Sequence, residues 1–119
     1  MAIEERVICA SEALLEDGAG LRFELEYEGT ITAAFVVRFA GQAHAYINRC
    51  AHVRAELDWQ PGQFFDASGL SLICAVHGAS YDPATGECVG GPCRGARLIP
   101  VPVDEQNGFI KLKRSYKGS

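Results

Sequence analysis

The chain has 119 residues, which is enough for one compact domain with a single buried core. Apolar residues make up 48% of it and charged residues 22%, and apolar runs such as residues 33–37 are far too short to span a bilayer, so we expect a soluble protein with no membrane partner. The net charge is −4 and no Lys/Arg stripe is present, which argues against nucleic acid as a partner. The N-terminal residues lack the basic region and long apolar stretch of a secretion signal, which predicts a cytoplasmic location.

Strand-like alternation recurs along the chain between turn signals, and helix-like patterning is scarce, which predicts an all-β fold. Residues 11–17 are one of the few plausible helical pieces, and the Asp-Pro sequence at residues 82–86 predicts a type I turn. A hairpin is expected around Ala40-Gly41, and a later strand should end at Cys74. Strands are predicted within residues 31–48, 69–74, 96–103 and 108–114, with prolines marking an edge in the third of these.

The five cysteines are an odd number in a chain without an apparent export signal, which favours metal binding or thiol chemistry over a disulfide framework. Two of them precede histidines, as Cys50-x-His52 and, 21 residues later, Cys74-x2-His77. Structural zinc sites usually pair Cys with Cys and His with His, whereas this order alternates. Alternation suits a 2Fe-2S centre in which each of two loops sends its cysteine to one iron and its histidine to the other. A zinc site and unligated core residues remain as alternatives.

The same segments resemble the Rieske iron–sulfur proteins. The matching motifs are "CAH" at 50–52, "CAVHGASYD" at 74–82, "TGECVGGPCRG" at 85–95 and "LIPVPV" at 98–103. The resemblance implies one 2Fe-2S cluster with Cys50 and Cys74 on one iron and His52 and His77 on the other. It implies antiparallel sheets over a single domain, residues 1–119, with a cluster-binding subdomain at about residues 48–95 inserted in a β base domain. Three further residues are implied beside the cluster, namely Gly78, Tyr81 and Pro92.

Departures from the family pattern indicate which branch the chain resembles. Respiratory Rieske proteins carry a disulfide between the two loops, but the corresponding positions here are Ala55 and Val76. This looks like the ferredoxin branch. High-potential members have a serine and a tyrosine that donate hydrogen bonds near the cluster, and these positions hold Ala79 and Tyr81. With one donor missing, we expect a potential in the lower to middle part of the Rieske span, roughly −150 to +300 mV.

Other conspicuous residues have plainer interpretations. Cys88 and Cys93 could be extra ligands or a disulfide, but small half-buried residues near the cluster are favoured. Cys9 is expected in the core of the first strand, and His44 on the exposed face of a hairpin. The arginines near the cluster loops could steer an acidic partner or be solvated loop charges; they are Arg49, Arg54, Arg94 and Arg97.

No second domain with a mononuclear iron site is present, so the chain by itself is not expected to be an oxygenase or any other enzyme. The predicted function is that of a Rieske-type ferredoxin, a one-electron carrier between a flavin reductase and an oxygenase or similar acceptor. The alternatives are a small electron-transfer subunit of a permanent oxidoreductase complex and a zinc-stabilised binding module.

Overall fold

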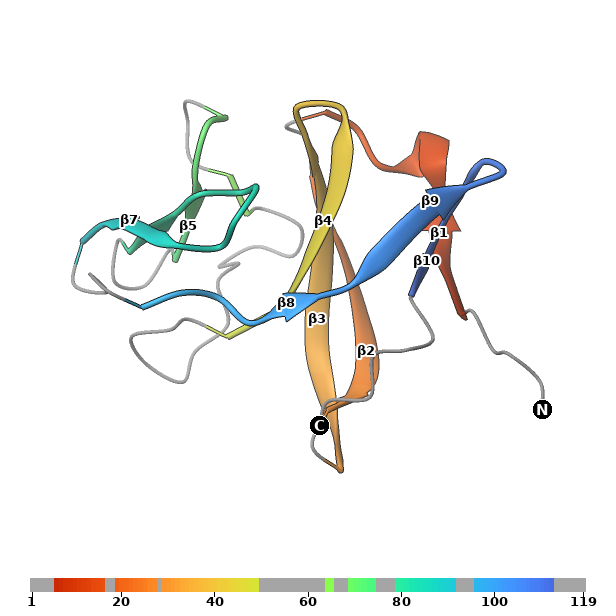
Figure 1. The fold of residues 1–119 in the computed structure, drawn as a ribbon, viewed down its shortest axis with the longest axis horizontal. Helices are drawn as coiled ribbons and strands as arrows, with labels where there is room; N and C mark the ends of the chain where they lie inside the picture. Colours follow the sequence, from red (N-terminus) through yellow and green to blue (C-terminus); the bar gives the residue numbers. More distant parts are fainter. Residues whose placement is uncertain are drawn as a thin grey trace.

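The computed structural model describes residues 6–16, 19–27, 29–49, 64–65, 69–74, 79–91 and 96–112. Within these residues the chain forms strands and one short 3-10 turn, η1, and all named strands pair in antiparallel fashion (Figure 1). In chain order the elements are β1 (Arg6–Ala10), η1 (Ser11–Ala13), β2 (Leu21–Tyr27), β3 (Thr30–Phe39), β4 (Gln42–Ile47), β5 (Leu72–Ile73), β6 (Ser80–Tyr81), β7 (Cys88–Gly90), β8 (Pro100–Val101), β9 (Val103–Gln106) and β10 (Phe109–Leu112). The predicted all-β class is confirmed.

The strands form three sheets, with the orders β1-β10-β9, β2-β3-β4-β8 and β5-β6-β7. The four-stranded sheet stands in the middle of Figure 1, with the small β5-β6-β7 sheet on one side of it and the β1-β10-β9 sheet on the other. β8 is an edge strand of the four-stranded sheet, as the prolines predicted. Proline favours this position because it has no backbone N–H to donate to a further strand.

The centre of β3 is buried on both of its faces. Ala34, Phe35, Val36 and Val37 are all 0% exposed. Since side chains alternate along a strand, Phe35 and Val37 enter one hydrophobic core while Ala34 and Val36 enter a second one. The first core reaches the small sheet, and the second contains residues of the β1-β10-β9 sheet. β3 therefore divides two cores.

The predicted hairpin around Ala40-Gly41 is confirmed as the connection between β3 and β4. Both turn residues have positive φ, 54° and 80°, as a two-residue type I′ turn requires. Alanine is not favoured in that conformation. The Glu16 carboxylate accepts the backbone N–H groups of Ala40 (2.6 Å) and Gly41 (2.9 Å), which stabilises the turn from outside the hairpin.

Two predicted elements are shorter than expected. The helix predicted at residues 11–17 is wrong beyond its first residues. Among the described residues up to 16, Ser11–Ala13 form a 3-10 turn. Leu14 then has an extended backbone and is buried in the second core. The strand predicted at residues 69–74 is regular only at Leu72–Ile73. In both places tertiary packing of the chain decides the local conformation.

The predicted turn at residues 82–86 connects β6 to β7 and is one residue longer than a type I turn. Asp82 accepts the N–H of Gly86 through its backbone oxygen (2.7 Å) and that of Ala84 through its side chain (2.8 Å). Gly86 has a φ of +82°, and a Cβ placed on it would lie 2.8 Å from Cε1 of Tyr46. The Tyr46 hydroxyl in turn donates to the backbone oxygen of Pro83 (2.7 Å). Tyr46 thus attaches this turn to β4.

Arg38 attaches η1 and β9 to β3. Its guanidinium donates to the backbone oxygens of Leu14 (2.8 Å) and Ser11 (3.0 Å) and binds both oxygens of Glu105, at 3.1 and 2.8 Å. The Arg38 side chain is 15% exposed. The pairing raises the pKa of Arg38 and lowers the pKa of Glu105. Charged donors that satisfy backbone carbonyls contribute more than an exposed ion pair alone.

Replacement of Arg38 by glutamine should lower the free energy of unfolding by about 1–3 kcal/mol, because it leaves backbone carbonyls of a partly buried segment without a donor. Urea denaturation followed by circular dichroism measures this change. Glu105→Gln removes only the ion pair, so its cost should be at most about 1 kcal/mol. Because the folded-state pKa of Glu105 is lowered, that smaller cost should fade as the pH falls below about 4. Equal costs for the two variants would contradict this assignment.

Gly86→Ala should destabilise the protein by about 2–4 kcal/mol, since it adds both a left-handed alanine and a clash with Tyr46. Gly29→Ala is the matched control, because Gly29 has nearly the same φ (+79°) and a Cβ added to it would meet nothing within 4 Å. The control should cost only about 1–2 kcal/mol. Thermal or urea unfolding of both variants tests the difference, and similar losses would exclude a role for the Tyr46 contact.

Candidate metal centre

Cys74 lies at the end of a hairpin that the small sheet holds closed. β5 and β6 pair Leu72 with Tyr81 and Ile73 with Ser80, and the backbone N–H of Cys74 donates to the oxygen of Ala79 (2.8 Å). Only residues 75–78 connect these two paired positions. Cys74 is 0% exposed, and its thiol is not part of a disulfide.

The segment that carries Cys50 is attached to the fold on both sides. Before it, Asn48 donates its backbone N–H to Ala33 (2.9 Å), which fixes the end of β4 on β3. After it, Phe64 accepts the backbone N–H of Ile73 (2.9 Å). The strands that lead to both Cys-His motifs therefore belong to one connected framework.

A third connection, residues 92–95, is closed in the same way. Cys88 donates its backbone N–H to Ala96 (2.9 Å), and Glu87 forms an isolated antiparallel bridge with Arg97. Pro92 belongs to this connection by sequence. Cys88 and Ala96, the two paired residues at the start of this connection and at its end, pack against the first hydrophobic core.

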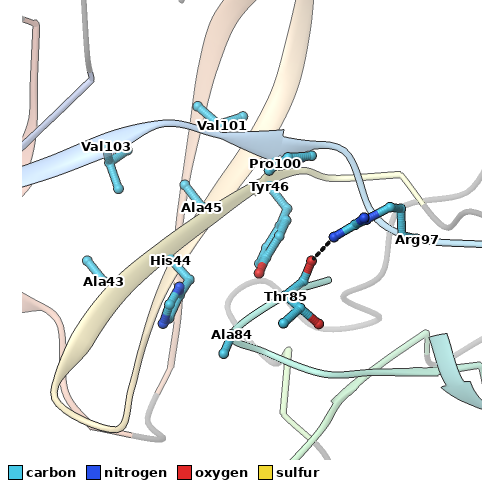
Figure 2. Close-up of a pocket in the computed structure, with 10 residues that line it drawn as sticks. All are labelled: Ala43, His44, Ala45, Tyr46, Ala84, Thr85, Arg97, Pro100, Val101 and Val103. Carbon is cyan, nitrogen blue, oxygen red and sulfur yellow. Dashed lines mark hydrogen bonds between the residues drawn. The ribbon is translucent and has the colours of Figure 1, made fainter. Parts of the chain in front are cut away.

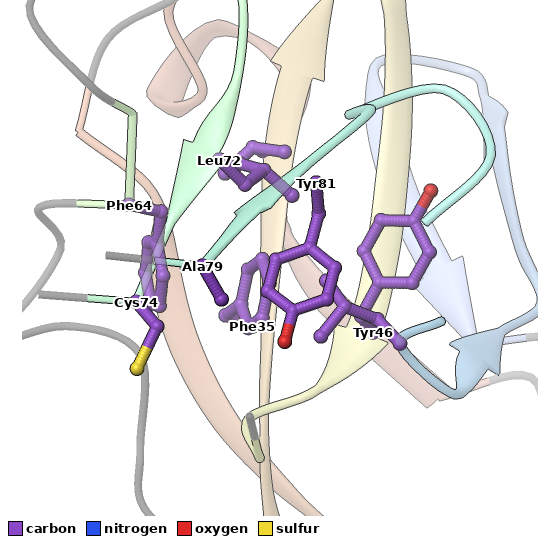
Figure 3. Close-up of a cluster of buried hydrophobic side chains, with 9 residues drawn as sticks. Phe35, Tyr46, Phe64, Leu72, Cys74, Ala79 and Tyr81 are labelled. Atoms are coloured by element: carbon purple, nitrogen blue, oxygen red, sulfur yellow. The ribbon is translucent and has the colours of Figure 1, made fainter. Parts of the chain in front are cut away.

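Buried aromatic and aliphatic side chains form an apolar wall around Cys74 and Tyr81 (Figure 3). Phe35 and Phe64 stack with ring centroids 4.0 Å apart and an interplanar angle of 13°, and Phe35 also contacts Tyr46 at 5.9 Å. In Figure 3 the Cys74 sulfur and the Tyr81 hydroxyl are both directed to the lower side of the view. The buried members of this core are Phe35, Val37, Tyr46, Phe64, Leu72, Cys74, Ala79, Tyr81 and Leu98.

Gly20 allows Phe64 to approach β3. A Cβ on Gly20 would lie 2.6 Å from Phe64 and 2.9 Å from Val37, so any larger residue would displace the stacked ring. Sequence reasoning missed both Phe64 and Tyr46 as parts of this wall. The alternation within residues 31–48 was the available signal for Tyr46, whereas Phe64 follows a turn-rich stretch that carries no periodic pattern.

The structure brings together two of the residues predicted for the site, Cys74 and Tyr81, in one buried core. Five others lie outside the described residues, namely Cys50, His52, His77, Gly78 and Pro92. Within the described ranges no group of three or more His, Cys, Asp and Glu side chains forms a metal site. A buried thiol outside any disulfide, at the end of a hairpin on an apolar wall, fits a cluster ligand because thiolates are the ligands of iron–sulfur clusters.

Two plainer interpretations need correction. Cys88 is disulfide-bonded, and its partner lies outside the described residues, so the less favoured disulfide interpretation holds at this position. His44 was expected on an exposed face, but it is half-buried, and burial lowers the pKa of its imidazole.

The structure also places some of the remaining residues. Arg97 is exposed and Arg49 half-buried, while Arg54 and Arg94 lie outside the described residues. Cys9 lies on β1 as predicted and packs against the second core.

The Rieske [2Fe-2S] domain family matches residues 5–107 of the chain. Among solved structures, a ferredoxin of Sphingomonas yanoikuyae B1 is similar with a TM-score of 0.71 and 24% sequence identity, over 92% of this chain and 98% of that one. The ferredoxin of carbazole 1,9a-dioxygenase from Nocardioides aromaticivorans IC177 gives 0.68 and 22%, over 93% and 98%. The terminal oxygenase of that system gives 0.68 and 19%, but the match spans 97% of this chain and only 31% of the oxygenase. No curated protein matches.

At these identities the solved structures establish the fold, and the family match covers most of the chain. The predictions of the family, of the all-β Rieske fold and of a 2Fe-2S cofactor are confirmed by these matches. No helix of the described residues has the length and apolar character needed to cross a membrane. The chain belongs to the Rieske [2Fe-2S] domain family.

Proposed function

We propose that this chain is a Rieske-type ferredoxin that carries one electron at a time from a reductase to an oxygenase or similar acceptor. The observation that carries the proposal is the buried Cys74 thiol at the end of the β5-β6 hairpin, in a chain whose family binds a 2Fe-2S cluster. Two of the similar structures are ferredoxins, and another is described as a complex of reduced oxygenase and oxidised ferredoxin in carbazole 1,9a-dioxygenase. That comparison supports an oxygenase as acceptor.

We infer that Cys50 and Cys74 hold one iron and His52 and His77 the other. When bound, the cluster supplies one-electron redox chemistry. Cys74 and His77 are three residues apart across a four-residue connection, so a single hairpin end supplies one ligand to each iron. Gly78 and Pro92 are proposed to lie beside the cluster, where small or rigid backbone permits close approach.

The chain's own residues would set how easily the cluster is reduced. Phe35, Phe64 and Leu72 exclude water from the inner side of Cys74, which lowers the local dielectric constant. Ala79 is fully buried beside them and has no side-chain donor. Tyr81 is also fully buried, and its hydroxyl is a side-chain donor of this wall that points to the same side as the Cys74 sulfur. We infer that Tyr81 donates a hydrogen bond to a sulfur atom of the centre.

A cytoplasmic location is part of the proposal. The thiols of Cys9 and Cys74, neither of which is part of a disulfide, support it, whereas the disulfide at Cys88 is the observation against it. Fluorescence microscopy or fractionation of the tagged full-length protein would test the location independently of redox chemistry.

Anaerobically purified protein should contain two irons and two acid-labile sulfides per chain and give a Rieske-type EPR signal after reduction. Cys74→Ser should lose the signal and most of the iron, because it removes one proposed ligand. Cys9→Ser is the matched control, since Cys9 is also outside any disulfide but lies on β1, in the second core. A colourless protein that contains zinc, or an unchanged signal in Cys74→Ser, would refute the centre proposed here.

The carrier role is tested separately from the centre. The protein should be monomeric in gel filtration. Its oxidised form should accept one electron from a flavin-dependent reductase, and its reduced form should pass that electron to an oxygenase, with the EPR signal reporting both steps. Co-purification in a stable complex that does not dissociate would favour the alternative, a permanent electron-transfer subunit. Exposed Leu70 (66%) and Val89 (58%), which belong to the part of the chain around the small sheet, are the observation in favour of that alternative.

Tyr81→Phe should lower the reduction potential by about 20–65 mV, which is the value of one lost hydrogen bond for a one-electron couple. Tyr46→Phe is the control, because Tyr46 is buried in the same core but its hydroxyl donates to the backbone oxygen of Pro83. Protein-film voltammetry or an EPR-monitored titration measures both variants. An unchanged potential in Tyr81→Phe, or an equal shift in Tyr46→Phe, would remove Tyr81 from the tuning mechanism.

A further inference from the structure

A pocket of about 430 Å³ opens between β4, the turn at residues 82–86 and the β8-β9 segment (Figure 2). β8 pairs with β4 only at Ala45↔Val101 and Tyr46↔Pro100, and after Pro102 the chain enters β9 of another sheet. The chain therefore moves away from β4 after Pro102, and the pocket lies between β4 and this departing segment. Its volume lies within the range of small-molecule sites.

The diverging strands leave backbone polar groups at the edge of β4. Ile47 donates its N–H to Ile99, which lies on the β8 side. In an antiparallel strand every second residue directs its N–H and C=O to the same edge, so Ala45 and Ala43 face this side as well. Ala45 is opposite Val101, but Ala43 lies beyond the last pair with β8 and lines the pocket. The edge of β4 at Ala43 therefore borders the pocket.

The polar side chains around the opening are those of Arg97, His44 and Thr85. The Thr85 hydroxyl accepts the backbone N–H of Glu87 (3.2 Å) and keeps its own proton to donate. Arg97 uses one guanidinium N–H for the backbone oxygen of Thr85 (3.0 Å) and forms no ion pair with a described carboxylate. His44 is half-buried and makes no hydrogen bond with the described residues. None of the lining residues is acidic. Asp82 is the acid whose charge acts on His44, and its side chain accepts the N–H of Ala84.

The other residues that line the pocket are apolar, and the Tyr46 ring gives part of this lining a flat surface. Figure 2 shows the Tyr46 ring beside His44, with Arg97 and Thr85 on its other side. The Tyr46 hydroxyl is already bonded to Pro83, so the ring offers mainly its face and edge. Small apolar side chains complete the wall, namely Ala43, Ala45, Pro100, Val101 and Val103.

We propose that this pocket binds a small carboxylate with a flat apolar body, such as an aromatic acid. The carboxylate would bind Arg97 and the Thr85 hydroxyl, with a further donor from His44 or from the Ala43 edge, while the body packs against Tyr46 and Val101. Donor groups without an acidic neighbour in the lining match an anion, and the apolar walls match a body that acetate or phosphate lacks. This assignment does not depend on the ferredoxin function proposed above.

The pocket shares one residue with the hydrophobic core that contains Cys74, the proposed iron ligand. Tyr46 lines the pocket and belongs to the same buried core as Cys74 and Tyr81. The turn that forms the lower wall follows directly on β6, which carries Tyr81. An anion bound here would place negative charge beside Tyr46, a member of the core that contains Cys74, and would disfavour reduction of the proposed cluster.

Benzoate is the probe, titrated into ¹⁵N-labelled full-length protein and followed by NMR and calorimetry. The amide signals of Ala43 and Thr85 should shift with saturation in the millimolar range or below. Benzamide, which lacks the charge, and acetate and inorganic phosphate, which lack the aromatic body, should each bind at least about tenfold more weakly. Phosphate binding as tight as that of benzoate would overturn the proposed ligand class, and an absence of saturable benzoate binding would overturn the site.

Arg97→Gln should weaken benzoate binding about tenfold, and Arg97→Lys should retain part of the affinity because it keeps the charge. Arg22→Gln is the matched control, since Arg22 is an exposed arginine on β2 and does not line this pocket. Circular dichroism and the iron content of each variant show whether it is folded. Val103→Asp provides a second variant, because it places a like charge in the wall, and it should abolish binding. Equal loss in Arg22→Gln, or unchanged affinity in both Arg97→Gln and Val103→Asp, would refute the proposal.

Discussion

The stacking of Phe35 on Phe64 is the contact on which the rest of the site depends. Phe35 belongs to the central strand of the large sheet, and Phe64 pairs through its backbone with β5 of the small sheet. Because the rings lie 4.0 Å apart and nearly parallel, the small sheet has no freedom to move away from β3 without exposing both. The position of Cys74 relative to β3 depends on this stacking, on the space that Gly20 leaves for Phe64, and on the Tyr46–Pro83 hydrogen bond that attaches the turn after β6 to β4.

Cys74 and Tyr81 were predictable as neighbours because their motif is local in sequence, whereas the full set of cluster ligands stays a prediction. Cys74 and His77 are separated by two residues, so their spacing alone suggested one loop with two ligands. The hairpin around Ala40-Gly41 was equally visible, since alternation on both sides of a turn signal fixes the pairing. The glutamate that supports its strained alanine was not predictable, because Glu16 reaches the turn from 24 residues earlier in the chain.

The features that sequence reasoning missed all depend on how distant segments meet. His44 lines a pocket together with residues 84–85 and 100–103, and no pattern near residue 44 reports the path of those distant segments. The short extent of η1 has a similar cause, since Arg38 and the second core hold residues 11–14 in place. The disulfide at Cys88 was one of three interpretations of the same residue, and composition alone favoured a thiol.

The division of the protein by β3 separates two kinds of mutational sensitivity. Substitutions of Phe35 or Val37 act on the core that contains Cys74 and Tyr81, whereas substitutions of Ala34 or Val36 act on a core that contains neither residue. Effects of changes in the two cores should be nearly additive where the substituted residues lie more than about 7–10 Å apart and share no contacts. Natural variation in the second core can therefore adjust thermal stability while the redox properties stay constant, which gives the two traits largely independent routes of evolution.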